Sequence, residues 1–275
     1  MHYLRFIVLA ALVLYISLVT FIPVDSFVLF PTTAPVSAGK AVRRTVSFEK
    51  GDLEIWVSRS TRAGASSRPD FYLLCFCGNA SRAEDGVQID LFPNKSLEVW
   101  GVNYPGYGGS TGPARLAKVG PAALAAFDAL AGIAGDRPIM LVGYSLGTTA
   151  ALYVAAHRPV VGVILQDAPA LRQMIVGEHG WWNLWLLAGP LALKVPAALD
   201  SVANAKAAQV PALFLVDELD TAVPPKYQKL VIQAYAGMKQ VISAPDGCHV
   251  APLAGSALSQ VQKWAETLLV APRGE

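Results

Sequence analysis

The sequence predicts an α/β fold, in which helices cover both faces of a mostly parallel sheet. Short apolar runs alternate with longer helical stretches along most of the chain, as expected of successive β-α-β units. One of these runs leads through a glycine-flanked turn at residues 143–147 directly into a helix rich in small residues. The length of 275 residues suits a single domain of this class.

The predicted strands begin with a hairpin, in which Val42–Phe48 and Leu53–Ser58 flank a glycine turn. Six further apolar runs are typical of strands buried on both faces: Phe71–Cys77, Leu97–Asn103, Pro138–Gly143, Val160–Gln166, Pro211–Val216 and Met238–Ser243. The predicted helices are Pro121–Ala134, Leu146–His157, Pro225–Ala236 and Gly255–Leu269. In such sheets the chemistry is expected at the carboxyl ends of the strands.

The N-terminal segment predicts a membrane anchor. No charge occurs from Phe6 to Ile22, a length that just spans a bilayer. Arg5 precedes this run and no Lys or Arg follows before Lys40, which places the domain on the extracytoplasmic side. A cleaved signal peptide is the alternative, but the run exceeds the usual apolar core of one. We therefore predict an anchor over residues 1–23, a linker over 24–41 and one domain over 42–275.

Composition excludes several other functions. The net charge is only +2, and no basic block interleaved with aromatic residues is present, so nucleic-acid binding has no support. Three cysteines at irregular spacing indicate neither a disulfide framework nor a zinc site. We predict no metal and no cofactor.

The turn at residues 143–147 has the sequence Gly-Tyr-Ser-Leu-Gly, and it predicts a nucleophile at Ser145. The Gly-x-Ser-x-Gly pattern is weak alone, but here an apolar strand leads into it and a helix follows, which is the context that a nucleophile elbow requires. The flanking glycines allow strand and helix to approach closely. A serine that merely caps the helix is the alternative.

A serine nucleophile needs a base and a carboxylate that orients it. Of the four histidines, His249 is the best base, because it follows the last predicted strand and precedes the final helix. For the carboxylate we predict Asp220, with Asp217 as the rival, because Asp220 lies in the loop beyond the strand. The order Ser145, Asp220, His249 is that of one large class of serine hydrolases.

The oxyanion of such a reaction needs two backbone N–H donors, for which we predict Leu146 and Asn79. Asn79 belongs to Cys-Gly-Asn-Ala at residues 77–80. Together with the glycine-rich run at 102–112 and the serine turn, this motif resembles the BEM46-like group of α/β-hydrolases, over about residues 45–270. The resemblance implies an α/β-hydrolase fold, matches Asp220 to the acid loop and His249 to the histidine loop, and extends to related serine aminopeptidases.

The chain departs from that family at two positions. Cys77 stands where the family usually has histidine, and Pro105 stands where it has arginine. Neither change removes a member of the triad. Because Cys77 and Cys248 fall on loops expected near the same site, a disulfide between them is a further hypothesis, against which two buried thiols are the simpler interpretation.

Between Ala168 and Asp200 the alternation of strands and helices stops, and three of the six tryptophans fall in this segment. We predict a short apolar lid over about residues 169–200, which lines an acyl pocket or rests at the bilayer interface. The expected function is hydrolysis of an ester or thioester of apolar acyl or lipid character. Acyl transfer, peptidase activity and non-catalytic binding by a membrane-tethered protein are the alternatives.

Overall fold

The computed structural model describes the whole chain except residues 1, 35, 61–67, 87–90, 93–94 and 271–275. The described residues form an eight-stranded sheet in the order β1-β2-β4-β3-β5-β6-β7-β8. Its strands are β1 (Val42–Phe48), β2 (Gly51–Arg59), β3 (Phe71–Phe76), β4 (Leu97–Val102), β5 (Ile139–Tyr144), β6 (Gly162–Gln166), β7 (Ala212–Asp217) and β8 (Lys239–Ala244). The two pairs that include β2 are antiparallel, and the other pairs are parallel. The predicted α/β fold is confirmed.

The helices of the domain divide between the two faces of the sheet. The described helices that follow α1 and α2 are α3 (Ala83–Gly86), α4 (Leu116–Ala134), α5 (Gly147–His157), α6 (Leu171–His179), α7 (Ala188–Leu193), α8 (Ser201–Ala207), α9 (Pro225–Ala234) and α10 (Gly255–Val270). Apolar residues of α4, α5, α8 and α9 pack on the face that carries Leu74 and Leu141. Val261 and Ala265 of α10 pack on the other face, with Leu73 and Met140. Neighbouring strand residues thus enter opposite cores.

Helix α4 corrects one predicted boundary. The sequence places its start at Pro121, where an Ala/Leu-rich stretch begins. The structure begins the helix at Leu116, so Pro121 lies inside it. As the sixth residue of the helix, Pro121 leaves the Ala117 carbonyl without its usual helical donor, and both residues are exposed, where water can bond that carbonyl.

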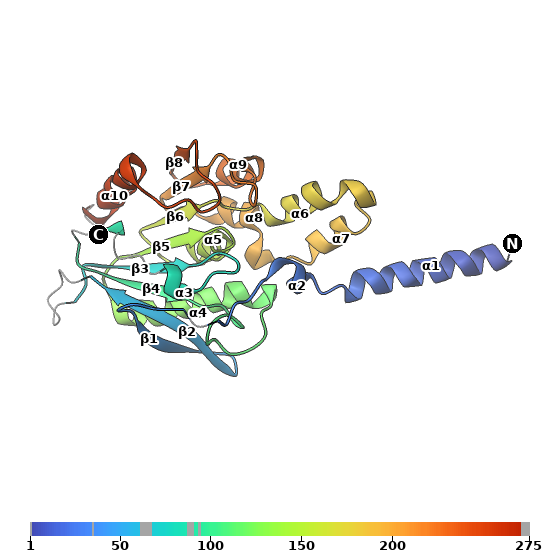
Figure 1. Cartoon of the computed structure of the whole chain (residues 1–275), viewed down its shortest axis with the longest axis horizontal. Helices are drawn as coiled ribbons and strands as arrows, with labels where there is room; N and C mark the ends of the chain where they lie inside the picture. The colour runs from blue at the N-terminus through green and yellow to red at the C-terminus, as the bar shows by residue number, and fades with distance from the viewer. Residues whose placement is uncertain (1, 35, 61–67, 87–90, 93–94, 271–275) are drawn as a thin grey trace.

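Helix α1 (His2–Phe21) projects from the domain, as Figure 1 shows, and none of its residues is buried. Among the described residues, two helices are long and apolar enough to cross a membrane: α1 and α4. α4 belongs to the core of the domain. α1 lies near the N-terminus and meets the requirements of a membrane anchor and of a signal sequence alike.

We use "lid" for residues 169–200, which include α6, α7 and two 3-10 turns at Trp181–Asn183 and Ala197–Leu199. The lid lies at the same end of the molecule as α1 (Figure 1). Two side chains connect them. The Tyr15 hydroxyl donates to the Leu186 carbonyl at 2.7 Å, and Lys194 Nζ donates to the carbonyls of Thr20 and Ile22 at 2.9 and 3.0 Å.

We use "strap" for residues 24–34, which begin with α2 (Val24–Val28) and fall within the stretch whose composition predicts a linker. The strap lies against the domain. Leu29 is buried in the core. Asp25 accepts from the backbone N–H of Leu116 at the start of α4 at 2.8 Å, and the Thr32 carbonyl accepts from Gly108 at 2.9 Å. The strap therefore joins α1 to the domain through specific contacts.

Candidate active site

Ser145 lies in the turn between β5 and α5, at the carboxyl edge of the sheet. Its φ of +50° falls in the left-handed region, which a non-glycine residue rarely adopts. The Ser145 N–H donates to the Gln166 carbonyl at the end of β6 at 2.8 Å, and the Ser145 carbonyl accepts from the Thr148 N–H and hydroxyl. These bonds hold the strained turn, and the N-terminus of α5 follows it directly.

Packing around the turn explains its two glycines. A Cβ on Gly147 would lie 2.0 Å from the Phe76 carbonyl oxygen, and a Cβ on Gly143 would lie 2.7 Å from Thr148 Cα. Both distances are far shorter than any normal contact. The glycines are therefore required because β3, β5 and α5 meet at this point with no room for side chains.

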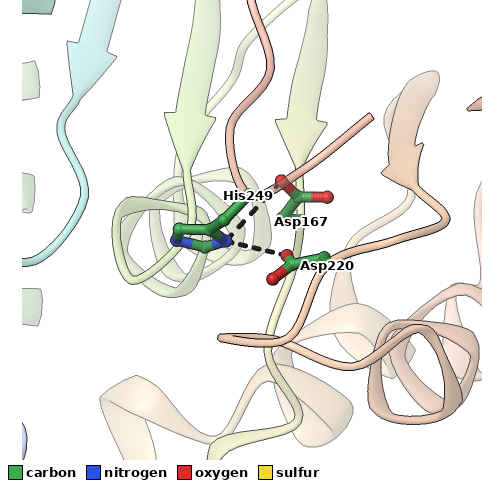
Figure 2. Close-up of side chains that lie close together, drawn as sticks. All are labelled: Asp167, Asp220 and His249. Atoms are coloured by element: carbon green, nitrogen blue, oxygen red, sulfur yellow. Dashed lines mark hydrogen bonds and ion pairs between the residues drawn. The ribbon is translucent and has the colours of Figure 1, made fainter. Parts of the chain in front are cut away.

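His249 and Asp220 lie side by side in loops that follow β8 and β7, as Figure 2 shows. His249 Nδ1 is 2.7 Å from Asp220 Oδ2. Because a carboxylate oxygen only accepts, this contact assigns the ring proton to Nδ1. Asp220 is buried, and its Oδ1 accepts from the N–H groups of Ala222 and Val223, each at 2.8 Å. The other ring nitrogen of His249 faces away from both carboxylates in Figure 2.

Asp217, the rival carboxylate, has another partner. It ends β7 and is buried, and its Oδ2 accepts from the Ala251 N–H at 2.8 Å. It also accepts from Gln166 Nε2 at 3.2 Å. Asp217 thus supports the backbone of the histidine loop, whereas Asp220 contacts the His249 ring.

A third carboxyl group, Asp167, was not predicted. It follows β6 directly, is fully buried, and has a φ of +54°. Its Oδ2 accepts from the Val250 N–H at 2.7 Å and lies 3.8 Å from His249 Nδ1, and its Oδ1 accepts from the Asp217 N–H at 3.1 Å. A polar residue immediately after a predicted strand was the only signal in the sequence that could have drawn attention to it.

Burial, together with the nearby Asp217 carboxyl, raises the pKa of Asp167 to about 7. One carboxylate oxygen of Asp167, one of Asp220 and one ring nitrogen of His249 all lie within 4.8 Å of one another. In this cluster Asp220 binds the histidine ring and Asp167 binds the histidine loop. The arrangement is that of a histidine oriented by one carboxylate and positioned by a second.

The predicted oxyanion donors lie on either side of Ser145. Leu146 follows the serine, and Gly78, beside Asn79, has so little room that a Cβ there would lie 3.3 Å from Ser145 Cβ. Within the described part of the chain, neither the Leu146 N–H nor the Asn79 N–H donates to a protein acceptor. Both N–H groups are therefore available to a ligand.

The side chain of Asn79 fixes this turn. Its Oδ1 accepts from the Phe30 N–H and the Tyr107 hydroxyl, both at 2.8 Å, and its Nδ2 donates to the Val28 carbonyl. Asn79 thus connects the strap to the predicted oxyanion turn. Tyr107 belongs to the glycine-rich run at 102–112, so this run also contacts the turn through its side chain.

The remaining histidines and the cysteines take no part in the contact between His249 and Asp220. His157 ends α5, where its ring bonds the Tyr153 carbonyl, and His2 begins α1. His179 is the last residue of α6. Cys77 is buried and Cys248 is exposed, and the structure does not join them in a disulfide.

A cavity of about 660 Å³ lies between Ser145, His249, the strap and the lid. Both predicted oxyanion residues, Asn79 and Leu146, also line it. The other lining residues, almost all apolar, are Ile22, Val24, Phe27, Val28, Phe30, Pro169, Leu171, Met174, Ile175, His179, Trp182, Asn183, Leu187, Ala188, Leu191, Ala222 and Val223. Its size and lining suit a small apolar ligand.

Comparison with protein families gives a match between residues 73–194 and the family model described as the alpha/beta hydrolase fold. The chain has the α/β-hydrolase fold. A comparison with curated protein sequences gives no match.

Solved structures of similar fold support this assignment. Est1E from Butyrivibrio proteoclasticus is 12% identical with a TM-score of 0.64, covering 83% of this chain and 99% of its own. An esterase from Pyrococcus furiosus is 13% identical with a TM-score of 0.61, covering 88% and 98%. An acylaminoacyl peptidase from Pyrococcus horikoshii is 11% identical with a TM-score of 0.62, covering 83% of this chain and 40% of its own.

Proposed function

We propose that this α/β-hydrolase cleaves a carboxylic ester or thioester of apolar acyl character through an acyl-enzyme on Ser145. The observation that carries the proposal is the 2.7 Å contact between His249 and Asp220 beside a cavity that Ser145 also lines. The fold and the esterase and peptidase structures that share it support a serine hydrolase in general. Est1E has been solved with ferulic acid, a small carboxylic acid, bound.

In the proposed reaction, Ser145 Oγ attacks the substrate carbonyl carbon while His249 Nε2 takes the hydroxyl proton. Asp220 accepts the Nδ1 proton in a hydrogen bond and stabilises the imidazolium that forms. The N–H groups of Leu146 and Asn79 bind the oxyanion of the tetrahedral intermediate. His249 then donates its proton to the leaving alcohol or thiol. In the second half, His249 takes a proton from water as the water oxygen attacks the acyl carbon, and it returns that proton to Ser145 Oγ as the carbon–Oγ bond breaks and the acid leaves.

The apolar cavity supports the choice of acyl group. Burial of an alkyl chain there contributes about 0.8 kcal/mol per methylene, and the described lining offers few polar groups to bind a peptide backbone. We propose further that α1 anchors the protein in a membrane with the domain on the extracytoplasmic side. The absence of Lys and Arg between α1 and Lys40 supports this orientation.

Labelling with a fluorophosphonate probe tests the proposed function. We expect the wild-type chain to be labelled and Ser145→Ala to be silent, because the probe reacts only with an activated serine. Ser259→Ala, at an exposed position on α10, is the matched control and should label like the wild type. A wild-type protein that does not react, or a Ser145→Ala variant that still reacts, would contradict the proposal.

A further inference from the structure

The tip of the lid exposes an unusually apolar surface. Trp181, Trp182, Leu184, Trp185 and Leu186 are all more than half exposed, and Leu184 reaches 72%. From Gly180 to Leu193 the lid carries no charged residue. A soluble monomer rarely exposes such a contiguous patch, and tryptophan is enriched at the boundary between a bilayer and water.

The lid tip also lies beside the segment that we propose to be membrane-embedded. The Leu186 carbonyl accepts from the Tyr15 hydroxyl of α1. Tyr15 precedes the end of α1 at Phe21 by six residues, which is about 9 Å along a helix. If α1 spans the bilayer and ends at its surface, Leu186 therefore lies inside the bilayer, deeper than the end of α1. The contact also gives the Tyr15 hydroxyl the acceptor that a polar group in hydrocarbon requires.

The first charge after the tip marks the membrane surface. Lys194 donates to the carbonyls of Thr20 and Ile22, at the carboxyl end of α1, where a cation is favoured. Its ammonium group thus sits at the level where α1 ends, and the uncharged residues 180–193 extend from there along α1. An amphipathic element at the membrane surface has the same distribution, with its apolar residues in the bilayer and its ammonium group among the lipid headgroups.

The cavity connects this level with the candidate catalytic residues. The cavity that Ser145 and His249 line is also lined by Ile22, which follows α1 directly, by Trp182 at the lid tip and by Phe27 of the strap. An acyl chain that leaves the bilayer between α1 and the lid therefore meets apolar side chains along its path to the serine.

We propose that the lid tip, residues 181–186, inserts into the bilayer beside α1 and admits the acyl chain of a membrane lipid to the cavity directly from the leaflet. The occupant of this surface is lipid, and the substrate is an ester within the bilayer. The substrate part rests on the proposed function, whereas insertion of the tip does not.

Quenching by lipid tests insertion without any need for activity. The full chain is reconstituted in phosphatidylcholine vesicles whose acyl chains are brominated or unbrominated. We expect brominated lipid to lower the tryptophan emission of the wild type, and this drop to shrink at least twofold in Trp181→Phe/Trp182→Phe/Trp185→Phe, which keeps the tip apolar. Equal quenching in both proteins would overturn the proposal, as would a dimer in the vesicles whose contact shields these tryptophans.

Activity tests entry from the bilayer. Trp181→Glu/Leu184→Glu changes two exposed tip residues that do not line the cavity. We expect hydrolysis of a long-chain diacylglycerol in the vesicles to fall about tenfold or more, because charge resists insertion, with no change on soluble nitrophenyl butyrate. Met238→Glu changes an equally exposed residue at the opposite edge of the sheet and should alter neither rate.

Each outcome of the activity test has a distinct meaning. An equal loss on both substrates, or no loss on the vesicle substrate, would overturn entry from the bilayer. A wild-type protein inactive on both substrates would contradict the proposed hydrolase function, and quenching would still decide whether the tip inserts.

Discussion

The two sides of the cavity are built in opposite ways. On the side of the sheet, Ser145, Asp220 and Asp167 are buried, and each is held by backbone hydrogen bonds at the ends of neighbouring strands. On the side of the lid and strap, the wall consists of apolar side chains, many of them partly exposed. The hydrogen bonds of the first side fix the orientation of the reacting groups, which proton transfer requires. The apolar side chains of the second side provide surface against which an alkyl chain can be buried. The difference predicts that mutations on the sheet side change kcat, whereas those on the lid side change the choice of substrate.

The largest effect is expected on the sheet side, from Asp220→Asn. The asparagine amide has no negative charge to stabilise the imidazolium that forms on His249. We therefore expect kcat on a short nitrophenyl ester to fall by roughly 10⁴-fold. Steady-state kinetics measure it. Asp128→Asn, which removes an exposed carboxylate on α4, is the control and should leave kcat unchanged. A fall of less than tenfold in Asp220→Asn would remove Asp220 from the proposed triad.

Asn79→Ala tests the point where the two sides meet. It removes the side chain that binds Phe30, Val28 and Tyr107 but keeps the backbone N–H proposed to bind the oxyanion. Because the turn is then held less firmly, we expect kcat to fall roughly 10- to 100-fold. Tyr107→Phe removes only one of these bonds and should change kcat by less than about threefold. An unchanged kcat in Asn79→Ala would show that the strap is irrelevant to the chemistry.

Leu191→Trp tests the lid side. Leu191 lines the cavity from α7, and the larger ring takes space that an acyl chain would fill. If two methylenes lose their place, kcat/KM for a dodecanoyl ester should fall about tenfold, with little change for an acetyl ester. Leu193→Trp, on the same helix but 79% exposed, is the matched control and should alter neither value. Equal losses on both esters would contradict the assignment of this wall to the acyl chain.

The smallest effect is expected from Asp167→Asn, because Asp220 still orients His249. We expect kcat to fall less than tenfold. The pKa of Asp167 in the folded protein, about 7, lies above its ordinary value of 3.8. Between these values the folded state binds more protons than the unfolded state, so stability falls as pH rises through this window.

Asp167→Asn should therefore show a shallower decline of Tm between pH 4 and 7 than the wild type, measured by thermal unfolding at several pH values. Asp128, whose pKa its bond to Arg158 lowers, titrates below this window, so Asp128→Asn should keep the wild-type slope. Parallel slopes in wild type and Asp167→Asn would indicate that Asp167 is ionised throughout.

Sequence predicted the sheet side better than the lid side, for physical reasons. Strands such as Phe71–Phe76 are apolar on both faces, so their position follows from local composition, and the order of Ser145, Asp220 and His249 follows from the order of the strands. Asp167 was missed because its importance comes from contacts with Val250 and Asp217, which are distant in sequence.

The strap is a second case. Residues 24–34 have the composition of a linker, yet backbone groups of Phe30, Thr32 and Ala34 form hydrogen bonds with Asn79, Gly108 and Arg82, which are distant in sequence. No periodicity results from such contacts. The start of α4 was misplaced for a related reason, since the Ala/Leu-rich stretch begins at Pro121 while the helix begins at Leu116, whose side chain packs in the core.

The docked strap has a practical consequence for anyone who expresses a soluble form of this protein. A truncation that begins at residue 42 would follow the domain boundary that composition predicts, and it would keep the whole sheet. It would also remove Ile22, Val24, Phe27, Val28 and Phe30 from the wall of the cavity, and with them the two strap groups that bond the Asn79 side chain, the Phe30 N–H and the Val28 carbonyl. The cavity of such a protein would lack one wall, and its substrate preference in a screen would differ from that of the full chain. An expressed fragment should therefore begin before Ile22.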